Sequence, residues 1–223
     1  MVIKRYVALT VMIAAVSVAG SVRGEIAFYT DRDVWENDIS GVIKTETFDE
    51  VTPYFLIEGI NSAGLIDIEM VNLSEVNQWN SIDNGTDTED FLSINGTTYY
   101  QGGCRLTDPD TRIDLRLPLA VGAFGADFTS THSSSYGNGL VLQVHGVDYF
   151  FNQLLPDTDG TGFLGFITTP GTSVVTLFAP ENNETFGLDN VSFVVPEPMT
   201  LILLSWGGWI LTGRKKNGAS KIK

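Results

Sequence analysis

The feature that most limits how this chain can fold is a series of short apolar runs. Turn residues separate these runs at intervals of roughly ten residues across positions 25–193. Val42–Phe48 and Arg112–Leu117 alternate between apolar and polar residues, as a strand with one buried face does. Asn95-Gly96 lies between two apolar runs, which is a strong hairpin signal. The pattern predicts an all-β domain, either a sandwich or a barrel.

One short helix is expected near the start of this body. Thr30 followed by Asp33 resembles a capping box, which favours a helix through Val34-Trp35. The polar segment Ser81–Asp90 is typical of a loop. Further strands are expected at Ile26–Phe28, Leu65–Met70, Ala120–Phe128, Leu140–Phe151 (two strands around His145-Gly146), Phe163–Ile167, Ser173–Phe178 and Phe186–Val194.

The first 24 residues have the three parts of a secretory signal peptide. Lys4-Arg5 precede the apolar run Tyr6–Val18, and the small residues Ala19–Ser21 follow it. We therefore expect residues 1–24 to act as a signal peptide for the secretory translocon, with cleavage after Ala19 or as late as after Gly24.

The last thirty residues, 194–223, also have three unlike parts. Val195-Pro196-Glu197-Pro198 is a proline-framed acidic motif, which neither a helix nor a strand can run through. Met199–Gly213 is uncharged, but it is shorter than the about 20 residues that a spanning helix needs. Arg214-Lys215-Lys216 begin the basic end, 214–223, which favours the cytoplasmic side of a membrane.

This order and spacing resembles the PEP-CTERM sorting signal of Gram-negative bacteria. The resemblance implies that exosortase, a membrane-embedded protease of transpeptidase-like character, recognises Val195–Pro198 and the basic residues. The protein would be anchored in the inner membrane through a hydrophobic helix at 199–213. Removal of the tail would then pass it to the cell surface or to an exopolysaccharide matrix. The same kind of tail is also described as the C-terminal region of ice-binding proteins, which implies nothing about activity here.

The body between these ends is strongly acidic. It contains five basic and 26 acidic residues, a net charge of −21. Such a surface repels nucleic acid and anionic lipid, so nucleic acid is not expected as a partner. Cys104 is the only cysteine, so no disulfide can form within the chain.

The body also resembles the small β-sandwich domains that such tails often carry. The residues that carry this resemblance are FYTDRDVWE, TFDE, VGAFGADF, FLGF and FGLDNVSF, in that order from Phe28 to Phe193. It implies a jelly-roll-like fold of two sheets for residues 25–193.

Calcium is the metal that this resemblance suggests. The segment FGLDNVSF resembles the closing strand of carbohydrate-binding jelly-rolls, in which an acid often shares a structural calcium with an acid near the N-terminus. That resemblance implies Asp189 as one ligand and Asp49 and Glu50 as the others, since hard cations prefer oxygen ligands. Asp157–Gly160 matches only part of a calcium loop and is more typical of a turn.

Catalytic motifs are weak in this sequence. The two histidines, His132 and His145, fall in a polar loop and at an expected hairpin turn, and no GxSxG element is present. We therefore expect a non-enzymatic protein with a structural or adhesive role. The alternative is a secreted hydrolase that acts on extracellular polysaccharide, because a fold alone does not exclude catalysis.

Four aromatic residues are candidates for contact with a matrix polysaccharide. Trp35, Trp79, Tyr99 and Tyr100 could offer flat faces to sugar rings, whereas the competing interpretation places them in the core. Trp79 is the least core-like, because polar residues surround it.

Overall fold

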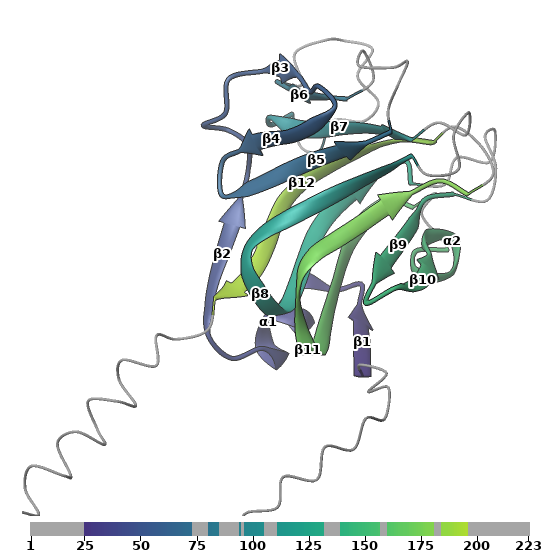
Figure 1. Cartoon of the computed structure of the whole chain (residues 1–223). Helices are drawn as coiled ribbons and strands as arrows, with labels where there is room; N and C mark the ends of the chain where they lie inside the picture. Colours follow the sequence, from purple (N-terminus) through teal and green to yellow (C-terminus); the bar gives the residue numbers. More distant parts are fainter. Residues whose placement is uncertain are drawn as a thin grey trace, which may run out of the picture.

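The computed structural model describes residues 25–72, 80–84, 94, 96–104, 111–131, 139–156, 160–180 and 184–195. The described part is all-β, as the sequence predicts, with twelve strands and two short helices (Figure 1). In chain order these are β1 Glu25–Tyr29, α1 Arg32–Asp38, β2 Val42–Glu46, β3 Tyr54–Phe55, β4 Gly59–Ala63, β5 Ile66–Val71, β6 Ser81–Asp83, β7 Tyr99–Cys104, β8 Arg112–Thr129, β9 Val141–Val144, β10 Val147–Phe150, α2 Phe151–Leu154, β11 Gly162–Phe178 and β12 Glu184–Val195.

The strands form one antiparallel hydrogen-bonded network. Its main path runs β10-β9-β11-β8-β12-β7-β6-β3. Three additions lie beside this path: β1 pairs with β11, β2 pairs with β12, and the β4–β5 hairpin joins β8 through β5. The turn residues His145-Gly146 connect β9 to β10, where the sequence predicts a hairpin.

Two long strands, β8 and β11, lie side by side and connect two halves of this network (Figure 1). The first part of β8, Arg112–Arg116, pairs with β5, and its last part pairs with β12. The first part of β11 pairs with β1, and its end pairs with β9. The β8–β11 register shifts between Ile167 and Val174. On either side of this shift, β8 pairs with a different second neighbour (β5 or β12), and so does β11 (β1 or β9).

The sequence predicts two strands where each of these long strands lies. Arg112–Leu117 and Ala120–Phe128 are parts of β8, and Phe163–Ile167 and Ser173–Phe178 are parts of β11. Pro118 does not end β8, because the β8 register pairs stop at Arg116 and resume at Val121. A proline between two paired stretches removes no ladder hydrogen bond.

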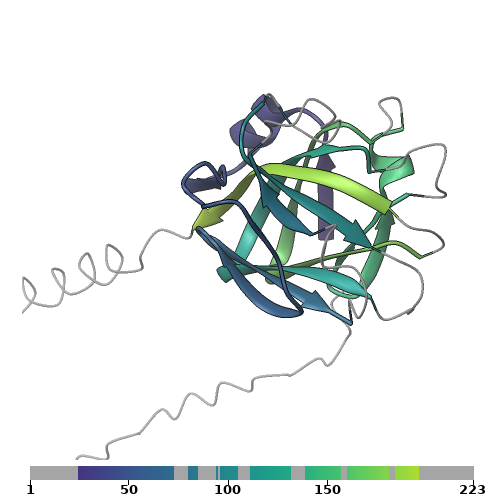
Figure 2. The ribbon, with the colours of Figure 1, turned by 90° about the horizontal axis from the view of Figure 1, so that it is seen from above.

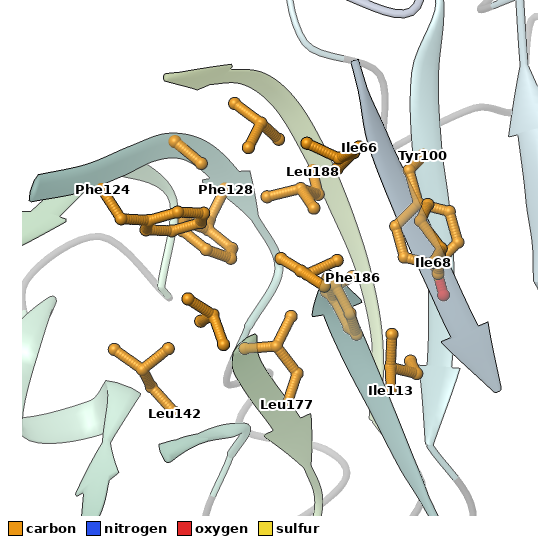
Figure 3. Close-up of a cluster of buried hydrophobic side chains, with 14 of the residues drawn as sticks. Ile66, Ile68, Tyr100, Ile113, Phe124, Phe128, Leu142, Leu177, Phe186 and Leu188 are labelled. Carbon is orange, nitrogen blue, oxygen red and sulfur yellow. The ribbon is translucent and has the colours of Figure 1, made fainter. Parts of the chain in front are cut away.

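Apolar side chains from both halves meet in one core. Figure 3 labels ten of them, contributed by β5, β7, β8, β9, β11 and β12: Ile66, Ile68, Tyr100, Ile113, Phe124, Phe128, Leu142, Leu177, Phe186 and Leu188. Each is at most 2% exposed. Seen from above, the strands surround this common interior (Figure 2).

A second, smaller apolar cluster lies beneath α1. It contains Trp35 with Ala123, Phe163 and Val194. Gly125 of β8 and Gly165 of β11 are directly opposite each other, and a Cβ on either would lie within 3.0 Å of the Phe163 ring. These two glycines therefore make the space in which α1 packs against the sheet. The N-cap of α1 is Asp31 and not the predicted Thr30, since Asp31 Oδ1 accepts the backbone N–H of Val34 at 3.0 Å.

Both ends of the described body lie at the same side of the fold. β1 begins and β12 ends at the lower end of the body in Figure 1. The last residue of β12, Val195, pairs with Val42 of β2. One smaller expectation differs from the structure, because Ser81–Asp83 of the predicted loop is a strand. The predicted Asn95-Gly96 hairpin lies partly outside the described residues and stays a prediction.

Candidate functional site

Two of the acids predicted for a metal site come together from distant parts of the chain. Asp49 lies in the turn after β2, and Asp189 lies in β12. The Thr97 hydroxyl donates to Asp189 Oδ2 at 2.8 Å, and the backbone N–H of the adjacent Thr98 donates to Asp49 Oδ1 at 3.3 Å. One short segment before β7 therefore contacts both carboxylates. Glu50 is exposed in the same turn as Asp49.

The backbone at this place departs from regular strand geometry. Asn190 has φ 51°, and the β12–β8 register shifts between Asp189 and Ser192. Asparagine adopts this left-handed conformation more readily than most residues do. On the opposite side, Phe48 has φ 57°, and its carbonyl accepts the N–H of Val51 at 2.8 Å. The bulge and the turn together bring the two acids to one place.

A third acid, which the sequence did not indicate, completes the group. Asp127 of β8 lies directly opposite Asp189 of β12. Arg32 of α1 pairs with Asp127 at 3.1 Å, and the Asn190 side-chain amide donates to Asp127 at 2.8 Å. We call Asp49, Thr97, Asp127, Asp189 and Asn190 the Asp189 cluster; Arg32 lies at its edge.

Asp189 is the buried member of this cluster. It is 1% exposed, and burial raises the pKa of its carboxyl from 3.8 to about 6. Hydrogen bonds from Thr97 and from the backbone N–H of Asn190 lower this pKa, while the charges of Asp127 and Asp49 raise it. Burial is the largest of these effects, so the neutral form of Asp189 is favoured up to mildly acidic pH.

Both carboxylate oxygens of Asp189 and of Asp127 already meet protein donors. Asp189 Oδ1 accepts the Asn190 backbone N–H at 2.6 Å and Oδ2 accepts the Thr97 hydroxyl, while Asp127 is already paired with Arg32. Among the described residues, no group of three His, Cys, Asp or Glu side chains could hold a metal ion. A calcium ion needs six or more oxygen ligands, so the donor set does not fit the predicted site at Asp49, Glu50 and Asp189.

Three of the four aromatic residues predicted for sugar contact are buried. Trp35, Tyr99 and Tyr100 are 0% exposed, so the prediction is wrong for these three. The Trp35 indole donates to the Phe166 carbonyl at 3.3 Å, and the Tyr100 hydroxyl donates to Asn80 Oδ1 at 2.8 Å. Their large apolar area and single polar atom suit the core, which is the competing interpretation. Trp79 lies outside the described residues.

The sorting motif begins where the described fold ends. Val195 is the half-buried last residue of β12 and packs against the main core. Pro196, Glu197, Pro198, Arg214, Lys215 and Lys216 lie outside the described residues. In the part of the chain that the structure describes, no helix is long and apolar enough to cross a membrane.

His145 and Cys104 are the base and nucleophile candidates that lie among the described residues. His145 lies in the exposed β9–β10 turn, with Nε2 2.9 Å from the Pro170 carbonyl oxygen. Cys104 ends β7, and His132 lies outside the described residues.

Sequence reasoning missed two residues that hold the Asp189 cluster to the rest of the fold. Asp127 ends the segment AFGAD, and its place opposite Asp189 depends on a strand register that the sequence pattern does not state. Arg32 is one of only five basic residues between 25 and 195. In so acidic a body, this scarcity could have indicated Arg32 as a partner for a buried or half-buried acid. Arg32 contacts Asp127, Ser192 and the Asn190 carbonyl, and its guanidinium lies 4.5 Å from the centre of the Phe163 ring.

Comparison of the chain with protein-family models gives no match, and comparison with curated proteins gives none either.

Proposed function

We propose that this chain is an exported envelope or extracellular-matrix protein, which exosortase sorts and processes through its PEP-CTERM tail. The observation that carries the proposal is the three-part tail at 194–223, with its motif at Val195–Pro198. The fold supports it in one respect. β12 ends at Val195, next to Pro196, so the motif starts where strand pairing stops.

The signal peptide supports the same route. β1 begins at Glu25, directly after the expected signal peptide, and it begins at the end of the body where β12 finishes (Figure 1). Removal of residues 1–24 and of the tail after the motif takes away no strand described above. Both membrane-directed segments would therefore leave from one side of an intact domain.

We further propose that the body is a jelly-roll-like sandwich with a structural or adhesive role and no catalysis. The two halves that share β8 and β11 around one core support a two-sheet arrangement. The rival hydrolase would need a reachable acid, and a carboxyl with a raised pKa is a usual feature of such enzymes. Asp189 has such a pKa, but it is 1% exposed and held on both oxygens.

Replacement of the motif tests the sorting proposal. A variant with Pro196→Ala, Glu197→Gln and Pro198→Ala should keep its tail and remain in the inner membrane of a host that produces exosortase. The matched control is Glu50→Gln with Pro53→Ala, which changes an exposed acid and an exposed proline of the body. The control should be processed like the wild type. Equal processing and surface delivery of both variants would contradict the proposal.

A further inference from the structure

We propose that the body pairs with a second copy of itself through an apolar patch beside β3 and on β4, together with two arginines of β8 on the same face. The patch consists of Phe55, Ile57 and Ile60, and we call it the Ile60 patch. This inference goes beyond the proposed function and does not depend on the sorting tail. β3 and β4 lie at the upper end of the body in Figure 1, away from the end where β12 finishes and the tail begins.

The first argument is the concentration of exposed apolar side chains in one short stretch. Among the described residues, seven large apolar side chains are exposed, and four of them lie between positions 55 and 65. Phe55, Ile57 and Ile60 are 66%, 63% and 61% exposed, whereas Leu56 and Asn61 beside them are buried. Scattered exposed apolar residues need no explanation, but a group of them marks an interaction surface.

Hydrogen bonds fasten the backbone beneath the patch. The Asn61 side chain accepts the backbone N–H of Ile57 at 3.0 Å and donates to the Ile57 carbonyl at 2.7 Å. The Tyr54 hydroxyl donates to the Ser62 carbonyl at 2.8 Å, which joins β3 to β4. The patch is therefore preformed, and a partner that covers it causes little further loss of conformational entropy.

The second argument is that charged side chains of both signs stand beside the patch. Ile60 lies directly opposite Glu69 of β5, and Glu69 lies directly opposite Asp114 of β8. Arg116 pairs with Glu69, and Arg112 pairs with Asp114 at 3.3 Å. The side chains of Arg116 and Arg112 are 41% and 46% exposed, so their remaining N–H donors can reach carboxylates of another molecule.

This combination fits a second copy of the chain. A two-fold contact uses the same surface on both copies, so that surface must be complementary to itself. Here the apolar patches can cover each other, and the arginines of each copy can face carboxylates of the other. Two of the five basic residues of the body, Arg112 and Arg116, stand on this face, which reduces the repulsion between two acidic copies there.

Other kinds of partner fit this face less well. The net charge of −21 repels anionic lipid and nucleic acid. A sugar ring stacks on flat aromatic faces, and two of the three patch residues, Ile57 and Ile60, are branched aliphatic side chains.

Sedimentation velocity of the wild-type protein purified from its exporting host measures this pairing. The repulsion between two bodies of −21 is screened by salt, because the Debye length falls from about 30 Å at 0.01 M to about 8 Å at 0.15 M. We expect dimers at the higher salt concentration, in a fraction that grows with protein concentration. A wild type that stays monomeric at every salt and protein concentration would mean that a different partner covers the patch, and the proposal would be overturned.

The double variant Ile57→Asp, Ile60→Asp should be monomeric under the same conditions, because it places two charges inside the contact. The matched control is Val34→Asp with Val147→Asp, which adds the same charge at exposed apolar side chains of α1 and β10. The control should form dimers like the wild type. All these proteins have the same ends, so association through a retained tail would be equal in all of them. Equal dimerisation of the two double variants would contradict the proposal.

Arg116→Gln tests the charged part of the face. It should weaken the dimer by roughly two- to fivefold, as the loss of an exposed ion pair does. Lys44→Gln removes the same charge from an exposed position on β2 and should leave the Kd unchanged. If both substitutions change the Kd equally, net charge alone governs the association, and the proposed face is wrong.

Hydrogen exchange of the wild type gives a test that needs no variant to fold. In dimer-forming salt, amides of residues 54–62 should exchange more slowly in concentrated than in dilute protein. The edge strand β10, Val147–Phe150, is the internal control and should exchange at the same rate in both. Protection that increases in neither segment, or equally in both, would overturn the proposal.

Discussion

At the scale of single residues, the turn between β4 and β5 depends on a buried carboxylate. Glu46 is 7% exposed, and its two oxygens accept the backbone N–H groups of Phe48 at 2.7 Å and Leu65 at 2.5 Å. Gly64 lies beneath this carboxylate with φ 72°, and a Cβ there would be 2.0 Å from Glu46 Oε2. Glu46 therefore connects the end of β2 to the β4–β5 turn.

Gly64→Ala should consequently be strongly destabilising. The left-handed backbone costs about 1–2 kcal/mol for a residue with a side chain, and displacement of the Glu46 hydrogen bonds adds about 1–3 kcal/mol. Gly59→Ala is the matched control, because Gly59 has φ 95° and a Cβ there meets nothing within 4 Å. Denaturant unfolding of both variants would measure the difference. Equal losses would mean that the Glu46 contact contributes nothing.

Some residues of the candidate site could be predicted from the sequence, and others could not. Asp189 and Asp49 were indicated by the resemblance of FGLDNVSF to the closing strand of carbohydrate-binding jelly-rolls. Their partner Asp127 could not be predicted, because a register shift of one residue would move it to the other face of β8. The burial of Trp35 and Tyr100 was equally hidden, since an amphipathic ring suits either a surface or a core.

At the scale of elements, α1 packs on the sheet through its buried residue, Trp35. Trp35 is 0% exposed, packs against Phe163 at a ring-centre distance of 5.5 Å, and lies over the two glycines that open the sheet surface. Trp35→Ala should cost about 3–5 kcal/mol of unfolding free energy. Val34→Ala is the control on the same helix, because Val34 is 50% exposed, and it should cost under 1 kcal/mol. Similar losses for both would contradict the packing described for α1.

Element boundaries were less predictable than element type. The alternation of apolar and polar residues indicated most of the strands, because one face of each is buried. The fusion of two predicted strands into β8 could not be foreseen, since Pro118 normally interrupts a strand and here falls between two paired stretches. Which halves of β8 and β11 pair with which neighbours is set by packing across the whole core, and no local pattern records it.

At the scale of the whole molecule, the body carries a net charge of −21. Repulsion among these charges opposes the compact state, and dissolved salt screens it. The Tm at neutral pH should therefore rise by several degrees as sodium chloride increases from low to physiological concentration. Calcium and magnesium chloride at equal ionic strength should act alike, because the described acids do not form a calcium site. A Tm that is insensitive to salt would contradict this view of the charge.

The sorting proposal also concerns the whole molecule, because it predicts where the mature protein begins and ends. The folded body runs from β1 to β12, and the segments expected to direct export lie before Glu25 and after Val195. The proposed function therefore predicts a particular pair of ends for the mature protein.

Intact-mass and terminal-peptide mass spectrometry of the wild-type protein recovered from the cell surface or matrix tests this most directly. The proposal predicts a chain that begins between Gly20 and Glu25 and contains no peptide from Met199–Lys223. A surface protein that retains residues 199–223 would contradict the central claim that the tail is a processed sorting signal.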